Sequence, residues 1–175
     1  MFNIKAGHMA SLLEKAIEKK KRSHNNDPQL VSFTKEIKAF DPITFFEVAK
    51  QLEKDRIFWS DPTFSIVGVG RAYDMIANES HFEETEKQWH RILENAIVHN
   101  PYKTSGTGVV AFGGMAFDPK KPTTTLWQNF KPSQFIIPEC LMTKNDKGHF
   151  LTVTVQLDER HDVEKLESIL KEVET

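Results

Sequence analysis

The sequence has little of what marks secreted, membrane or nucleic-acid-binding proteins. It contains a single cysteine, Cys140, which cannot form an internal disulfide, so nothing indicates an oxidising compartment. No apolar run approaches the ~20 residues that span a bilayer, and the N-terminus lacks the pattern of a secretory signal. The 23 basic and 25 acidic residues give a formal charge of −2, whereas a nucleic-acid-binding face would be basic. We therefore expect a cytoplasmic protein with no membrane or nucleic-acid partner.

The sequence also lacks the common metal-binding motifs, such as HExxH or paired cysteines. His81, His90 and His99 are spaced nine residues apart on one predicted helix, so neighbours point to opposite faces and cannot share an ion. We interpret them as surface histidines. Cys140 lies in an apolar predicted strand, where a free cysteine usually behaves as a small buried hydrophobe. A nucleophilic thiol would need a base and an electropositive pocket, which the sequence does not show.

Two features could suggest a ligand site. The segment GTGVVA at residues 106–111 matches the GxGxxA spelling of a dinucleotide-binding loop. That loop needs a strand before the glycines and a helix after them, whereas here a β-branched run follows. We expect a turn that leads into a strand. Lys35 interrupts the apolar face of a predicted strand, and two interpretations stay open. In the one that we favour, its aliphatic chain covers apolar surface while its ammonium group stays in water. In the other, the ammonium group binds an anionic ligand.

The length and composition suit one globular domain. The chain has 175 residues, of which 39% are hydrophobic and 27% charged, close to ordinary usage. A domain of this size buries roughly 70% of the surface that its unfolded chain exposes, so a real core is possible. The start of the chain resembles a cloning scar at Gly7-His8-Met9. We expect residues 1–10 to be a tag or a disordered segment, and residues 11–175 to form the domain.

Hydrophobic periodicity predicts an alternation of helices and strand pairs. Helices are expected at residues 11–22, 42–52, 80–99 and 163–173, and half-buried or buried strands at 31–38, 56–60, 64–69, 109–112, 135–142 and 150–157. Asp41 before Pro42 fits a helix start, as does Ser80 with Glu83. The connection at residues 115–133 has little periodicity, and we predict that Trp127 and Phe130 anchor it as buried residues. Hairpins separated by helices favour an α+β fold with a mainly antiparallel sheet.

Two stretches resemble a known enzyme family. The first is RIFWSDP at residues 56–62, followed by FSIVGVG at 64–70; the second is FGGMAFD at 112–118, with Trp127 at a familiar spacing. The GGxAFD element is shared by chorismate-using enzymes, and its combination with the FWS hairpin resembles isochorismate synthase. The tryptophan-sensing LLES element of anthranilate synthases does not occur. The resemblance extends from about residue 30 to the end of the chain.

This resemblance implies a β-sandwich of α+β type with helices outside. It also implies a Mg²⁺-dependent isomerase that adds water at one ring carbon of chorismate and removes a hydroxyl at another. The lysine base, the glutamic acid and the Mg²⁺-holding glutamates of that family lie in a C-terminal portion that this chain lacks. The resemblance therefore implies Mg²⁺ in the full-length parent, none in this chain, and no catalytic, substrate-binding or metal residue here. The family-motif positions, expected to be structural, are Trp59, Gly68, Gly70, Gly113, Gly114, Phe117, Asp118 and Trp127.

Two functions remain as hypotheses. In the first, the chain is the N-terminal structural portion of an isochorismate synthase of menaquinone or siderophore biosynthesis, inactive alone, and its partner is the missing C-terminal portion. In the second, it is a free-standing, non-catalytic binding or interaction module with the same fold. A reading frame that continues beyond Thr175 would favour the first.

Overall fold

The computed structural model describes residues 28–78, 81–118 and 124–157, together with residues 11, 15, 18 and 19, which are helical. The elements that it describes are, in order, β1 (Leu30–Glu36), α2 (Pro42–Val48), the 3₁₀ helix η1 (Ala49–Leu52), β2 (Arg56–Ser60), β3 (Ser65–Val69), β4 (Tyr73–Ala77), α3 (His81–Asn95), β5 (Ile97–His99), β6 (Phe112–Met115), β7 (Ser133–Ile137), β8 (Cys140–Asn145) and β9 (Gly148–Gln156). The α+β class predicted from the sequence is confirmed. Within these residues, no helix has the length and apolar character needed to cross a membrane.

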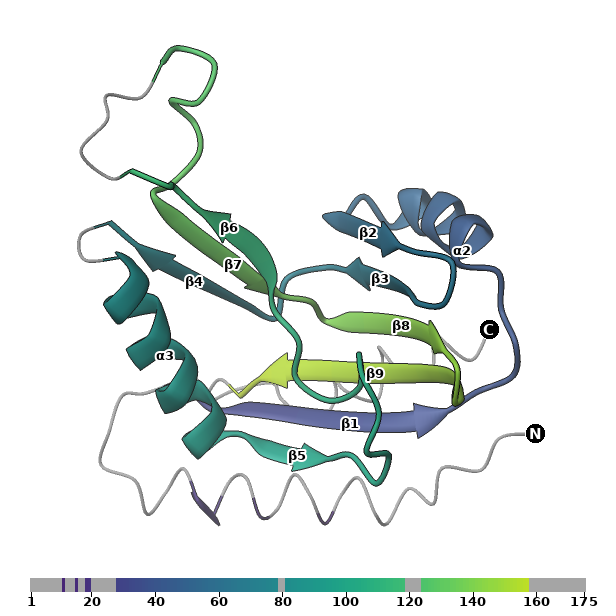
Figure 1. Cartoon of the computed structure of the whole chain (residues 1–175). Coiled ribbons are helices and arrows are strands. Elements are labelled where there is room, and N and C mark those ends of the chain that lie inside the picture. Colours follow the sequence, from purple (N-terminus) through teal and green to yellow (C-terminus); the bar gives the residue numbers. More distant parts are fainter. Residues whose placement is uncertain are drawn as a thin grey trace.

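A six-stranded sheet with the order β2-β3-β8-β9-β1-β5 forms the larger layer (Figure 1). Its neighbours pair antiparallel except β1 and β5, which are parallel. β1 and β9 were expected to be half-buried, but both faces of each are covered: Ser32, Thr34, Thr152 and Thr154 are buried like the apolar residues between them. The hydroxyl groups form hydrogen bonds with one another, as between Thr34 Oγ1 and Thr152 Oγ1, which lie 2.8 Å apart. Such pairing removes most of the cost of burying polar groups.

α2 and η1 cover one face of this sheet. The predicted start of α2 is confirmed, because the Asp41 carboxylate accepts a hydrogen bond from the Thr44 N–H at 2.7 Å and Pro42 occupies the first turn. Phe45, Phe46 and Ala49 pack against the main core. The buried members of that core are Val31, Phe33, Ala49, Val67, Val69, Cys140, Met142, Leu151, Val153, Val155 and Leu157.

A second sheet, of order β4-β7-β6, stands beside the first, and α3 covers one of its faces (Figure 1). A second core between them contains Leu30, Met75, Ile92 and Ile137. The sequence predicted one strand over residues 135–142, and this was wrong. The strand is divided at Pro138, which cannot donate to a sheet ladder, so that β7 belongs to the small sheet and β8 to the large one.

Other elements also differ from expectation. α3 ends at Asn95 rather than continuing to His99 as expected, because residues 97–99 extend and pair with β1. β4 was not anticipated, and β6 begins three residues later than the strand expected at 109–112. The predicted helix at 163–173, the capping box at Ser80 and the segment 1–10 lie outside the described residues.

Candidate functional site

An apolar trough of about 610 Å³ lies on the face of the small sheet that α3 does not cover. Phe112 and Gly114 of β6 and Gln134 and Ile136 of β7 form its floor, since these positions alternate with the buried residues that face α3. Ile57, from β2 of the large sheet, also lines it. The trough is therefore built where the two sheets meet.

Adjacent glycines on β6 differ in their surroundings. A Cβ atom on Gly113 would lie 2.0 Å from the carbonyl oxygen of Gln134, which is backbone and cannot yield. A Cβ atom on Gly114 would meet nothing within 4 Å. Gly113 is thus required for β6 to approach β7, whereas Gly114 leaves the trough floor open.

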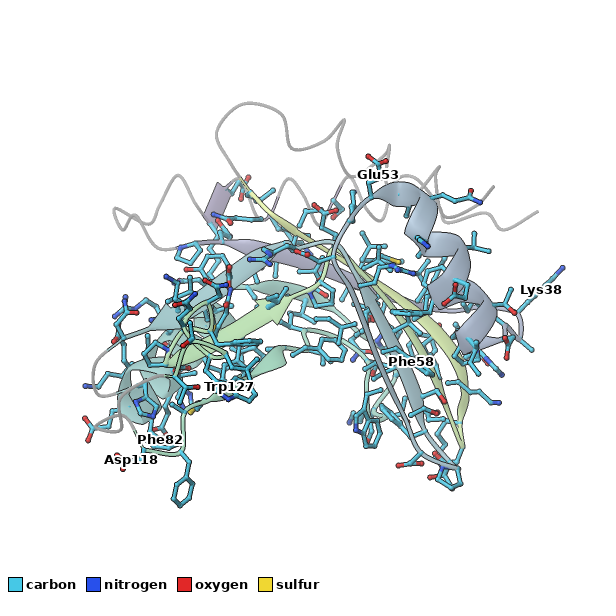
Figure 2. The ribbon with its side chains drawn as sticks, turned by 90° about the horizontal axis from the view of Figure 1, so that it is seen from above. Lys38, Glu53, Phe58, Phe82, Asp118 and Trp127 are labelled. Atoms are coloured by element: carbon cyan, nitrogen blue, oxygen red, sulfur yellow. The ribbon has the colours of Figure 1, made fainter. Side chains whose placement is uncertain are left out.

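Trp127 and Phe130 form a wall of the trough, from the connection between β6 and β7. Their rings lie 5.1 Å apart and are 55% and 63% exposed. The prediction that they are buried anchors was wrong. The connection runs on the outer side of a sheet whose other face is already covered by α3, so these rings cannot reach a core. Figure 2 shows Trp127 beside the small sheet, far from Phe58 and α2.

A polar network fixes one part of the floor. The Gln134 amide donates to both carboxylate oxygens of Asp74, at 3.0 Å each. Arg71 in turn donates to Asp74 and, at 2.8 Å, to Asp55. Partial burial lowers the pKa of Arg71, but its hydrogen bonds and charge interactions with Asp55 and Asp74 outweigh this effect and the pKa is raised. Gln134 is therefore held by groups outside the trough.

His81 holds the segment that follows β6. It is buried, and its Nε2 lies 3.0 Å from the carbonyl oxygen of Ala116, which also lines the trough. The interpretation of the three helix histidines as surface residues was thus wrong for His81. His90 is exposed as expected, and the ring of His99 stacks on Phe33 at 5.0 Å. The burial of His81 could not be predicted from the sequence, because the apolar stripe of the predicted helix was taken to begin at Phe82.

Four of the family-motif positions line the trough: Gly113, Gly114, Asp118 and Trp127. Gly68 lies beneath it, since a Cβ atom there would stand 3.1 Å from the ring of Phe112.

The other motif positions lie elsewhere. Trp59 is half-exposed on β2, with its ring 5.7 Å from that of Phe64. Gly70 adopts a φ of +74°, and a Cβ atom there would stand 2.7 Å from the Glu139 carboxylate. Phe117 is 99% exposed. Gln134 and Ile136 could not be identified as lining residues from the sequence, because β7 carries apolar residues on both faces. Ile57 and Phe112 were not identified either, although both lie in the stretches that resemble the family.

The glycine segment at residues 106–108 is a structural turn, as predicted. Gly106 and Gly108 have φ values of +79° and +81°, and the described residues 109–111 after them lead into β6 rather than into a helix. Thr143 donates to the Gly106 carbonyl at 2.6 Å, and the Gly108 N–H donates to Thr34 at 3.1 Å. The loop thus covers buried hydroxyls of the large sheet. Lys35 is half-buried and is not part of the trough.

Cys140 is buried in the main core, as predicted. Burial raises the pKa of its thiol to about 12, so the thiolate is absent near neutral pH. Among the residues that the structure describes, no three His, Cys, Asp or Glu side chains gather as metal ligands would.

The model of a family described as chorismate binding enzyme matches residues 12–175. The chain belongs to the chorismate-binding enzymes. The isochorismate synthase MenF of Bacillus subtilis is 33% identical over 155 residues, which make up 83% of this chain and 33% of that protein. The salicylate biosynthesis isochorismate synthase of Pseudomonas aeruginosa is 25% identical over 111 residues, or 63% of this chain and 22% of that one.

The solved structures agree on the fold. The menaquinone-specific isochorismate synthase MenF of Escherichia coli superimposes with a TM-score of 0.52 at 13% identity, covering 93% of this chain and 33% of that structure. This member of the chorismate-binding family thus spans about a third or less of the length of the curated relatives it matches.

Proposed function

We propose that the chain is the N-terminal, non-catalytic portion of an isochorismate synthase, whose full-length form converts chorismate to isochorismate. The family match covers nearly the whole chain, and the identity to the Bacillus subtilis enzyme is 33%. The same match accounts for only 33% of that enzyme's length. This combination of high coverage of the chain and low coverage of the relative is the observation that carries the proposal.

The chemistry of the trough supports a structural rather than a substrate-binding role. Chorismate carries two carboxylates, and a dianion is bound by several cations or N–H donors. The trough is mostly apolar, and among the lining residues that the structure describes the ionisable side chains are one acid, Asp118, and one base, Lys131. These charges of opposite sign do not suit a dianion. Chorismate is therefore expected to bind elsewhere in the full-length enzyme.

Mg²⁺ and the pathway follow from the same proposal. Mg²⁺ would be held in the full-length enzyme by residues outside this chain, since the resemblance implies that the family's Mg²⁺-holding glutamates lie in the C-terminal portion. The isochorismate would serve menaquinone or siderophore synthesis, because one relative is named menaquinone-specific and another is named for salicylate biosynthesis. A cytoplasmic location is part of the proposal, supported by the single cysteine, and cell fractionation would test it.

A free-standing, non-catalytic binding module is the second candidate. The exposed pair Trp127 and Phe130 favours it, because large exposed aromatic rings are typical of recognition surfaces. Under this alternative the chain would act without any further portion of an isochorismate synthase.

The proposal is tested by incubating the purified chain with chorismate and Mg²⁺ and separating the products by chromatography. The positive control is the whole Bacillus subtilis MenF. We expect isochorismate from the control and none above buffer from this chain. Turnover by the chain alone would contradict the non-catalytic role. Calorimetric titration should likewise show no saturable Mg²⁺ binding at submillimolar concentration.

A further inference from the structure

We infer that a set of charged residues at the junction of the two sheets forms an ionic lock, which fixes the angle between the sheets and which salt can loosen. We call this set the junction cluster; its members are Lys54, Asp55, Arg71, Asp74 and Glu139. The inference concerns the conformation of this chain and does not depend on the proposed function.

Two short connections link the sheets and lie side by side (Figure 1). Residues 70–72 join β3 of the large sheet to β4 of the small sheet, and residues 138–139 join β7 of the small sheet to β8 of the large one. A third connection, residues 100–111, is much longer. Because a few residues at the ends of elements usually absorb a rotation of one layer against another, the two short connections are where such a rotation would occur.

Arg71 lies in the first connection, between two carboxylates. Its Nε and Nη2 atoms donate to Asp55 Oδ2 at 3.1 and 2.8 Å, and its Nη1 atom donates to Asp74 Oδ2. Asp55 directly precedes β2 of the large sheet, whereas Asp74 belongs to β4 of the small sheet. One guanidinium group therefore binds both sheets at the same time.

Glu139 lies in the second connection and is held from the same turn. Its carboxylate forms an ion pair with Lys54 at 2.7 Å. A Cβ atom on Gly70 would stand 2.7 Å from this carboxylate, so Glu139 also packs against the first connection. Lys54 and Asp55 are adjacent in the turn between η1 and β2, so two neighbouring residues of opposite charge bind the two connections.

The apolar contact between the sheets does not by itself fix their angle. The ring of Phe112 and the side chain of Pro138 would lie 3.1–3.3 Å from a Cβ atom on Gly68. Apolar contacts are not directional, whereas the rigid fork of a guanidinium group binds carboxylates in a defined geometry. We therefore assign the role of a pivot to the contact at Gly68 and the role of a lock to the junction cluster.

The lock is accessible to ions in solution. The side chains of Arg71, Asp55 and Lys54 are 39%, 55% and 41% exposed, and only Glu139, at 14%, is largely covered. Exposed ion pairs are individually weak, and salt screens them. Salt should therefore loosen the lock while both apolar cores stay intact.

The test measures the distance between the two layers in the full chain. Asp146, in the turn between β8 and β9 of the large sheet, and Glu86, on the helix α3 that covers the small sheet, are 75% and 72% exposed. Spin labels attached to Asp146→Cys and Glu86→Cys would give the distribution of this distance by pulsed electron paramagnetic resonance. Cys140 is buried and should stay unlabelled.

The labelled chain would be compared with the same chain carrying Arg71→Met, Lys54→Met or both substitutions. Methionine keeps much of the length of each side chain and removes its charge. The control is Lys50→Met, which removes an exposed charge of η1 outside the junction cluster. The unfolding temperature of each variant would be measured as well, and it should change little because exposed ion pairs contribute little to stability.

We expect a narrow distribution in the labelled chain, a broader and displaced one in Arg71→Met and in Lys54→Met, and the broadest in the double variant. Lys50→Met should leave the distribution unchanged. Raising the salt concentration to about 1 M should broaden the distribution of the unsubstituted cluster, because the Debye length falls to about 3 Å. A loss of stability alone would not move these distances in a chain that remains folded.

An unchanged distribution in folded Arg71→Met and Lys54→Met would overturn the inference. Equal broadening in Lys50→Met would do the same, because the effect would then not depend on the junction cluster. If a variant does not fold, the salt series on the unsubstituted cluster decides, since a distribution that stays the same up to about 1 M salt would contradict an ionic lock. None of these outcomes bears on the proposed function.

Discussion

The ring of Phe112 lies against the backbone of Gly68, so that a Cβ atom on Gly68 would stand 3.1 Å from its Cε2 atom. Gly68 belongs to the large sheet and Phe112 to the small one. The two stretches that resemble isochorismate synthases, far apart in the sequence, therefore meet where the sheets join. On its other side Phe112 lines the trough, so this contact also sets the depth of the trough floor.

The effect of substitutions at Gly68 on the free energy of unfolding should depend on the size of the new side chain. Alanine requires Phe112 and Pro138 to move by a few tenths of an ångström, since its Cβ would stand 3.1–3.3 Å from them, and should change the free energy of unfolding by less than about 1 kcal/mol. Valine adds two further methyl groups in the same place and should cost about 1–3 kcal/mol. Urea denaturation would measure both. Equal stability of the alanine and valine variants would show that the sheets do not approach this closely.

Trp127→Ala should leave the fold nearly as stable as wild type. A fully buried tryptophan would cost about 3–5 kcal/mol, but this ring is 55% exposed and mainly loses its contact with Phe130. We expect less than about 1.5 kcal/mol, the size of an aromatic pair. The matched control is Ile137→Ala, at a fully buried position, which should cost about 2–5 kcal/mol. Comparable losses for the two variants in denaturant titrations would mean that Trp127 is part of a core.

Thr34→Val should destabilise the large sheet although it keeps the side-chain shape. The Thr34 hydroxyl accepts a hydrogen bond from the Gly108 N–H and pairs with the Thr152 hydroxyl, all in buried surroundings. Removing it leaves two buried groups without that partner, at a cost of about 1–3 kcal/mol. Thr34→Ser keeps the hydroxyl and serves as the control. If the valine variant is as stable as the serine variant, the Thr34 hydroxyl does not stabilise the turn at residues 106–108.

Cys140 should be inert until the protein unfolds. Its pKa of about 12 in the folded state keeps the thiol protonated, whereas an ordinary cysteine has a pKa of 9.0. The folded chain should therefore react with iodoacetamide far more slowly than the unfolded chain at the same pH. Rapid labelling of the folded chain would contradict the burial of this thiol.

The same shift makes stability depend on pH. Below pH 9.0 the thiol is protonated in both states and its burial carries no charge penalty. As the pH rises toward 12, the unfolded state loses the proton first, so the free energy of unfolding falls. Between these pH values, the free energy of unfolding of the wild-type chain should fall with pH more steeply than that of Cys140→Ala, by up to about 1.4 kcal/mol per pH unit.

Much of the fold could be predicted from local patterns. The Asp41 cap and the hairpin at residues 56–69 depend on residues close in sequence, and the structure contains both. The β5 strand could not be found in this way. Ile97 continues the apolar stripe of α3, and only its pairing with Val31 of β1 makes residues 97–99 extended.

The candidate site could be predicted only in part. The motif at residues 112–118 marked Gly113, Gly114 and Asp118, all of which line the trough. The exposure of Trp127 was missed because apolar residues in an aperiodic connection are equally compatible with a core or with a binding surface. Whether Trp127 is buried or exposed depends on which face of the small sheet α3 covers, and no local pattern in the sequence indicates that face.

The rate of isochorismate formation by this chain together with the remaining two-thirds of Bacillus subtilis MenF would show whether the chain is a non-catalytic portion of such an enzyme. Each piece would be assayed alone and as the co-purified pair, with chorismate and Mg²⁺ in all three reactions. If this chain is the non-catalytic portion, it should form no isochorismate alone, the other piece should form little or none, and the pair should form isochorismate steadily. Product from this chain alone, or a folded pair that forms none, would contradict the account.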